Sequence, residues 1–94
     1  MMVDTNAVPQ EPRGFDFGMA LRALKDGCRV ARKGWNGKGI FVKLQRPDSN
    51  SKMTHPYIYI DTTGLKTDNH EAPKSLVPWL ASQTDMLSED WMVV

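Results

Sequence analysis

The sequence predicts an α+β domain in which an N-terminal helix packs on a small antiparallel sheet and a short helical turn precedes the last strand. Three observations predict it. Apolar residues recur at helical spacing after residue 16, later segments alternate apolar and polar residues, and the C-terminus is apolar and β-branched. A chain of 94 residues forms one domain with a small core, so we also expect a homo-oligomer.

The chain divides into an arm and one domain. Residues 1–14, "MMVDTNAVPQEPRG", hold two prolines and scattered polar residues without a hydrophobic period, which predicts a flexible arm. Residues 15–94 are expected to form a single α+β domain that binds a ligand.

The first element is a helix in "FDFGMALRALKDG". Asp16 is suited to the N-cap and Gly27 to the left-handed C-cap. The apolar residues at helical spacing are Phe17, Ala20, Leu21 and Leu24.

Two strands follow the helix, in "CRVAR" and "GIFVKLQ", each with period-two alternation. Between them stands the pair Asn36-Gly37. Both residues tolerate positive φ, so the pair predicts a two-residue hairpin turn of type I′.

The second half of the domain predicts two more strands around a short helix. "YIYIDTTG" alternates tyrosine and isoleucine, which predicts a strand with one aromatic face. Pro78 makes "SLVPW" an edge strand. Ser82 and Thr84 are good N-caps for one or two helical turns, and "DWMVV" is expected to join the sheet as its last strand.

The composition excludes several functional classes. Twelve basic and eleven acidic side chains give a net charge of +1, which is too weak a field for a DNA- or RNA-binding protein. The single Cys28 excludes an internal disulfide, and we expect it to be buried or half-buried. With no signal peptide or long apolar run, the sequence predicts no membrane association and a cytoplasmic location.

The common catalytic motifs are absent: CxxC, HExxH, GxSxG and the phosphate-loop lysine. Gly34, Gly37 and Gly39 fit turn chemistry better than a dinucleotide fingerprint. His55 and His70 lack partners at metal-ligand spacing. We therefore expect no enzymatic activity, no metal and no cofactor.

Acidic residues near the C-terminus have a simple interpretation. Asp85, Glu89 and Asp90 are expected to complement the dipole of the short helix and to face solvent.

Three tryptophans are unusual in so short a chain. We expect Trp91 to pack in the core, whereas Trp35 and Trp79 are as well suited to a ligand as to the core. A ligand built from bases and phosphates would stack on the indoles, with Arg32, Lys33 and Lys38 nearby as cations. A protein partner would use the same kind of surface.

The stretches "ALRALKDGCRVARKGWNGKGIFV" and "VPWLASQTDMLSEDW" resemble the phage-encoded second type of Thoeris anti-defence protein. The resemblance covers about Phe15 to Val94. It implies a sponge that binds an isomer of cyclic ADP-ribose (glycocyclic ADP-ribose) made by Thoeris TIR enzymes, without cleaving it, in the cytoplasm of the host bacterium. It also implies a homotetramer with ligand pockets between protomers, and for some members a separate site for guanine cyclic dinucleotides of the CBASS defence.

The resemblance and the residue chemistry together predict a ligand site. Trp35 and Trp79 are expected to be stacking faces, Asn36 a polar contact on the turn, and Phe41 a pocket wall. The hydrogen-bonding edge is expected to be Ser82, Gln83, Thr84 and Asp85. The alternative function is a protein-protein interaction module that uses the tryptophan-bearing surface.

Overall fold

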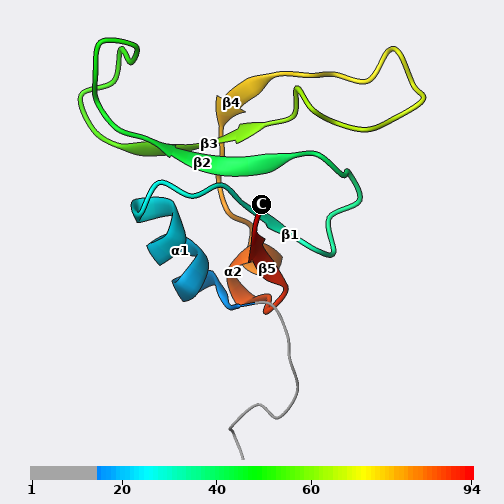
Figure 1. The fold of residues 1–94 in the computed structure, drawn as a ribbon, viewed down its shortest axis with the longest axis horizontal. Helices are drawn as coiled ribbons and strands as arrows, with labels where there is room; N and C mark the ends of the chain where they lie inside the picture. The colour runs from blue at the N-terminus through cyan, green and yellow to red at the C-terminus, as the bar shows by residue number, and fades with distance from the viewer. Residues whose placement is uncertain (1–14) are drawn as a thin grey trace, which may run out of the picture.

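A computed structural model describes residues 15–94 of the chain, and the predicted arm, residues 1–14, lies outside these residues. Within the described part, five antiparallel strands form one sheet in the order β4-β3-β2-β1-β5, and two helices lie on one side of it (Figure 1). The elements are α1 (Phe17–Lys25), β1 (Val30–Arg32), β2 (Phe41–Gln45), β3 (Tyr57–Asp61), β4 (Leu76–Pro78), α2 (Gln83–Leu87) and β5 (Trp91–Val93). The predicted α+β class is confirmed.

Helix α1 begins and ends as its sequence predicts. The side chain of Asp16 accepts a hydrogen bond from the backbone N–H of Met19 at 2.9 Å, which satisfies a donor that the first turn leaves unpaired. Gly27 ends the helix with φ of 93°. The buried face carries Ala20 and Leu24, which are 0% and 1% exposed.

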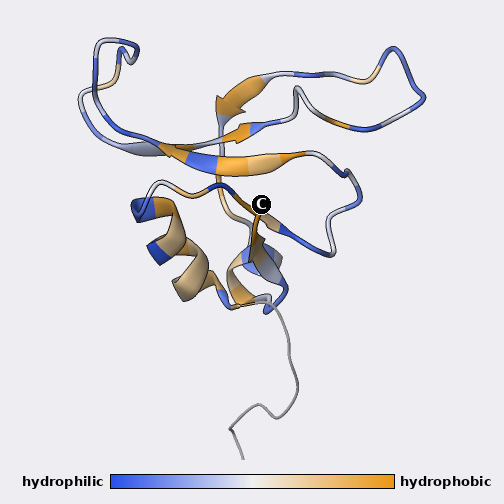
Figure 2. Ribbon diagram, viewed as in Figure 1, coloured by the Kyte–Doolittle hydropathy of each residue, from blue (hydrophilic) through white to orange (hydrophobic). Residues whose placement is uncertain are grey.

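The register of the sheet divides its residues between two faces. Val42 pairs with Val30 of β1 and with Ile60 of β3, and these side chains face the helices. Because side chains alternate along a strand, Phe41 and Lys43 point to the opposite face, which no described helix covers. The strands show as apolar segments between polar loops in Figure 2.

The core is small and lies between α1 and the sheet. Its fully buried large side chains are Leu24, Val30, Val42 and Trp91. Trp91 is 0% exposed, so its predicted place in the core is confirmed. Cys28 is half-buried, as expected.

The predicted type I′ turn at Asn36-Gly37 is wrong. Within residues 15–94, φ is positive only at Gly27 and Gly39, so Asn36 and Gly37 cannot form that turn. Residues 33–40 instead make a longer loop that contacts the loop after β3: the N–H of Lys66 donates to the carbonyl of Lys38 at 2.9 Å. This contact between distant segments, which no local pattern reveals, sets the shape of the loop.

The C-terminal elements agree with the sequence. Pro78 lies in β4, an edge strand, where a missing N–H breaks no central ladder. Ser82 caps α2 in a capping box with Asp85. Strand β5 pairs with β1, which closes the other side of the sheet. Neither described helix is long and apolar enough to span a bilayer.

Gly39 offers a test of the contact between the two loops. Its φ is 87°, and a Cβ added there would collide with the carbonyl oxygen of Gly64. We expect Gly39→Ala to lower the free energy of unfolding by about 3 kcal/mol in urea denaturation. Gly27→Ala is the matched control, because Gly27 has a similar φ of 93° and nothing within 4 Å of the added Cβ.

The control variant carries only the strain of the left-handed conformation, about 1–2 kcal/mol. Equal losses in the two variants would mean that the approach of Gly39 to Gly64 contributes nothing to stability.

Candidate functional site

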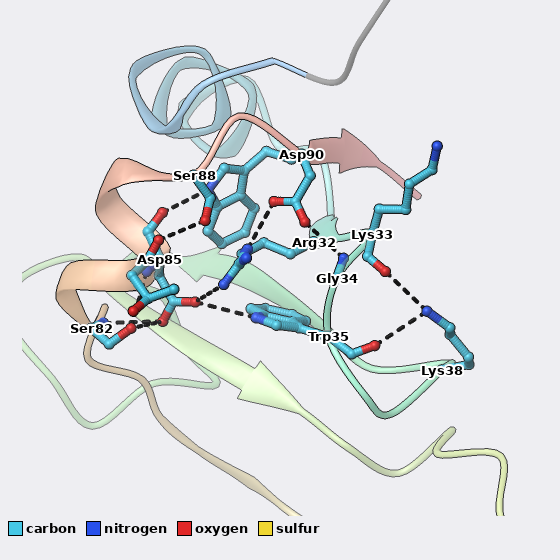
Figure 3. A network of polar contacts seen from close by, with 11 residues as sticks. Arg32, Lys33, Gly34, Trp35, Lys38, Ser82, Asp85, Ser88 and Asp90 are labelled. Atoms are coloured by element: carbon cyan, nitrogen blue, oxygen red, sulfur yellow. Dashed lines mark hydrogen bonds and ion pairs between the residues drawn. The ribbon is translucent and has the colours of Figure 1, made fainter.

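The site is organised by Arg32, the last residue of β1 (Figure 3). Its Nε donates to Oδ1 of Asp90 at 2.8 Å, and its Nη1 donates to Oδ1 of Asp85 at 2.9 Å. Asp85 belongs to α2, and Asp90 directly precedes β5. One guanidinium therefore connects a strand, a helix and the loop that leads to the next strand.

Both carboxylate oxygens of Asp85 are hydrogen-bonded. Oδ1 also accepts from the indole Nε1 of Trp35 at 3.2 Å. Oδ2 accepts from the backbone N–H and the hydroxyl of Ser82, at 3.0 and 2.9 Å. Asp85 is 9% exposed, so these donors replace the water that the carboxylate has lost.

Asp90 is held on both oxygens as well. Its Oδ2 accepts from the backbone N–H of Gly34 at 2.7 Å, while Oδ1 accepts from Arg32. A Cβ on Gly34 would lie 2.7 Å from Oδ2 of Asp90, so a side chain at this position would displace the carboxylate.

The pKa shifts follow from these contacts. Burial alone would raise the pKa of Asp85, but hydrogen bonds from Ser82, Arg32 and Trp35 outweigh it and lower the pKa. The hydrogen bond from Arg32 lowers the pKa of Asp90 despite partial burial, with help from the N–H of Gly34. The hydrogen bond to Asp90 is the largest cause that raises the pKa of Arg32. Both carboxylates are therefore ionised at neutral pH.

The expectation that all three acidic residues face solvent is wrong for Asp85 and Asp90. Only Glu89 of the three is exposed. The reason is Arg32, which lies more than fifty residues away in sequence and supplies the charge that makes burial favourable.

The three tryptophans meet beside this network. The ring of Trp35 lies 5.4 Å from that of Trp91 at an interplanar angle of 77°, and 6.3 Å from that of Trp79. Trp79 and Trp91 are 6.0 Å apart, and Phe17 lies 5.5 Å from Trp91. These edge-on and tilted contacts are favourable arrangements of aromatic rings. We call Trp35, Trp79 and Trp91 the tryptophan cluster.

Trp35 is half-buried and is not the exposed tip of a hairpin. The loop 33–40 turns the indole back toward the core. Lys38 holds that loop in shape, because its Nζ donates to the carbonyls of Lys33 and Trp35 at 3.0 and 3.2 Å. The indole N–H that needs a partner finds Asp85, so Trp35 contributes to the core and keeps part of its surface accessible.

The structure brings most of the predicted site residues together. Trp35, Trp79, Ser82 and Asp85 are connected by ring contacts and hydrogen bonds. Gln83 and Thr84 are exposed in the first turn of α2, and Asn36 is exposed in the loop after Trp35. Phe41 is not part of this group, because the alternation of β2 places it on the opposite face of the sheet.

Sequence reasoning missed the roles of Arg32, Asp90 and Gly34. Arg32 was expected to be a cation for a ligand, but its guanidinium is occupied by two carboxylates. One local signal was available: Ser82 and Asp85 have the spacing of a capping box, which turns the acidic side chain back onto the helix start.

The chemistry available at the site is that of binding. Asp85 and Asp90 position their neighbours, while the exposed groups of Asn36, Gln83 and Thr84 offer hydrogen bonds at the surface. In residues 15–94, no group of three or more His, Cys, Asp or Glu side chains is arranged to hold a metal ion.

These features define a class of protein, a small α+β domain with an ion-pair network beneath a tryptophan cluster. A family model described as a Thoeris anti-defense 2-like domain (Tad2-like) matches residues 15–94. A curated protein of Bacillus phage SP01, named "Thoeris anti-defense 2", is 35% identical over 86 residues, which cover 83% of this chain and 92% of that protein. The chain therefore belongs to the Tad2-like family, and the resemblance noted in the two sequence stretches is confirmed.

The Arg32 network predicts how stability depends on pH. Asp85 and Asp90 have lowered pKa values in the folded protein, so near the ordinary carboxyl pKa of about 4 the unfolded chain binds more protons. Their stabilisation is complete above this range and is lost as the pH falls through the folded values. We expect Asp90→Asn to cost about 1–2 kcal/mol at pH 7, and to lose less stability than the wild type on acidification.

Urea denaturation at pH 7 and in steps down to pH 3 measures both effects. Asp68→Asn, which removes an exposed loop carboxylate, is the control for the change in net charge. Parallel pH profiles of Asp90→Asn and the wild type would contradict the assignment.

Proposed function

We propose that this protein is a phage anti-defence protein that binds an isomer of cyclic ADP-ribose, the signal of Thoeris TIR enzymes, and sequesters it without cleaving it. Membership of the Tad2-like family supports an anti-defence role directed at Thoeris. The observation that supports binding is the arrangement of Trp35: it is half-buried, fixed by Asp85, and close to the exposed first turn of α2.

This arrangement suits a ligand that has both a base and polar edges. A base that stacks on an indole contributes about 1–3 kcal/mol, and the side chains of Gln83 and Thr84 are available for hydrogen bonds. A sponge must compete with the effector of the defence, which requires an affinity near nanomolar, or about −12 kcal/mol. A preorganised site reduces the entropy lost on binding, and the hydrogen bonds on Asp85 provide that rigidity.

The proposal includes a homotetramer with ligand pockets between protomers. Exposed apolar side chains lie next to the site: Leu80 and Leu87 are 91% and 79% exposed, and Met86 is 44% exposed. Large apolar side chains gathered on one surface are typical of protein interfaces. A neighbouring protomer that covered them would complete a pocket over Trp35. We place the protein in the host cytoplasm, with no nucleic acid or membrane as partner.

The test of the function is to recover the ligand. Purified protein is incubated with the cyclic ADP-ribose isomer, filtered and then heat-denatured, and the released nucleotide is identified by chromatography. We expect the signal to leave the filtrate and to return unchanged on denaturation. Recovery of a linear product would instead indicate an enzyme.

Two variants separate the indole from the polar edge. Gln83→Ala removes an exposed amide at the start of α2, and we expect it to weaken retention about tenfold with an unchanged melting temperature. Trp35→Phe keeps an aromatic ring but removes the donor to Asp85, and we expect it to weaken retention further. Asn50→Ala, which truncates an exposed amide in the loop between β2 and β3, is the matched control.

The same preparation tests the alternative function, a protein-protein interaction module. Tight binding of the nucleotide raises the melting temperature of the wild type by mass action. A melting temperature that does not change with saturating nucleotide would reject the sponge and favour the interaction module.

A further inference from the structure

The face of the sheet opposite the helices carries a groove of about 640 Å³. Its floor includes Phe41 of β2 and Met92 of β5, and its walls come from the loops 33–40 and 62–66. We call it the open-face groove. The tryptophan cluster packs against the core on the helix-covered face, so the sheet separates the two.

The open-face groove is positively charged. Arg29, Lys38 and Lys66 line it, against one carboxylate, that of Asp61. Asp61 is engaged by a neighbour: its Oδ1 accepts from the N–H of Thr63 at 2.9 Å and from the hydroxyl at 2.6 Å. Because the whole chain has a net charge of only +1, this excess of cations is a local feature.

The cationic side chains have defined positions. The guanidinium carbon of Arg29 lies 4.7 Å from the ring centroid of Phe41, a cation-π contact that holds a flat charged group over the floor. Nζ of Lys38 donates to two backbone carbonyls, which fix its place without neutralising its charge. Lys66 follows from the same loop contact, because its N–H donates to the carbonyl of Lys38 at 2.9 Å.

We propose that the open-face groove binds a small phosphate-bearing molecule that also has a flat ring. The cations match phosphate oxygens, which form charge-assisted hydrogen bonds, and the Arg29–Phe41 pair with Met92 matches the ring. The groove is bounded by loops on both walls, and three cations are too few to hold the backbone of a long nucleic acid. This site is separate from the tryptophan cluster and goes beyond the proposed function.

The test uses ADP as the probe, titrated into the full-length protein by isothermal calorimetry, with adenosine and pyrophosphate as the separate halves. We expect ADP to bind with a sub-millimolar dissociation constant and each half to bind more weakly. Lys66→Gln and Arg29→Gln should each weaken ADP binding about tenfold. Lys52→Gln, an exposed lysine in the loop between β2 and β3, carries the same charge change and should have no effect.

Absence of measurable ADP binding overturns the proposal, and so do equal losses in Lys66→Gln and Lys52→Gln, which would indicate a general charge effect. Thermal melts of each variant confirm that the exposed substitutions leave the fold intact. Retention of the cyclic ADP-ribose isomer distinguishes the two sites: Trp35→Phe should lower it and spare ADP binding, while Lys66→Gln should do the reverse. Loss of both activities in Lys66→Gln would reject a separate site.

Discussion

The contact on which the structure depends is the pairing of Arg32 with two carboxylates. The side chains of Arg32 and Asp85 are 14% and 12% exposed, so the pair has lost most of its water, a loss that favours unfolding. Two carboxylates face one guanidinium, which leaves an excess of negative charge. Hydrogen bonds from Ser82, Trp35 and Gly34 offset that excess, and the site is stable because every one of these donors is in place.

This network also determines where the tryptophans lie. The side chain of Asp85 fixes the indole of Trp35, and the backbone carbonyl of the same residue accepts from Nε1 of Trp91 at 2.9 Å. One turn of α2 therefore positions a core tryptophan and a half-buried one. Stability and ligand binding share these groups, so a substitution that loosens the network would disturb the aromatic surface even where the fold survives.

Local patterns in the sequence were sufficient to predict the helices, the strands and their caps. Asp16 and Gly27 predict the ends of α1 because capping depends on neighbours within one turn. Pro78 predicts an edge strand because of the missing N–H alone. These features have causes that lie within a few residues.

The errors have distant causes. Asn36-Gly37 has the composition of a tight turn, but the contact of Lys38 with Lys66 makes the loop longer. Asp90 has the composition of a solvent-facing residue, yet its partner Arg32 lies at the other end of the domain in sequence. The site residues on α2 and Trp35 were predicted as a group, because their types suit a ligand. Their mutual geometry could not be predicted, since it depends on how β1 and β5 pair.

The period-two alternation of β2 explains how so small a domain can present two different surfaces. Val42 faces the helices and is 0% exposed, while its neighbour Phe41 faces the open side beside Arg29. The core needs only one face of the sheet, because α1 covers it and the tryptophan cluster completes it. The other face is thus released from the demands of packing, and cationic side chains such as Arg29 and Lys66 are tolerated there without partners in the core. A single sheet can in this way carry an aromatic site on one face and a charged groove on the other.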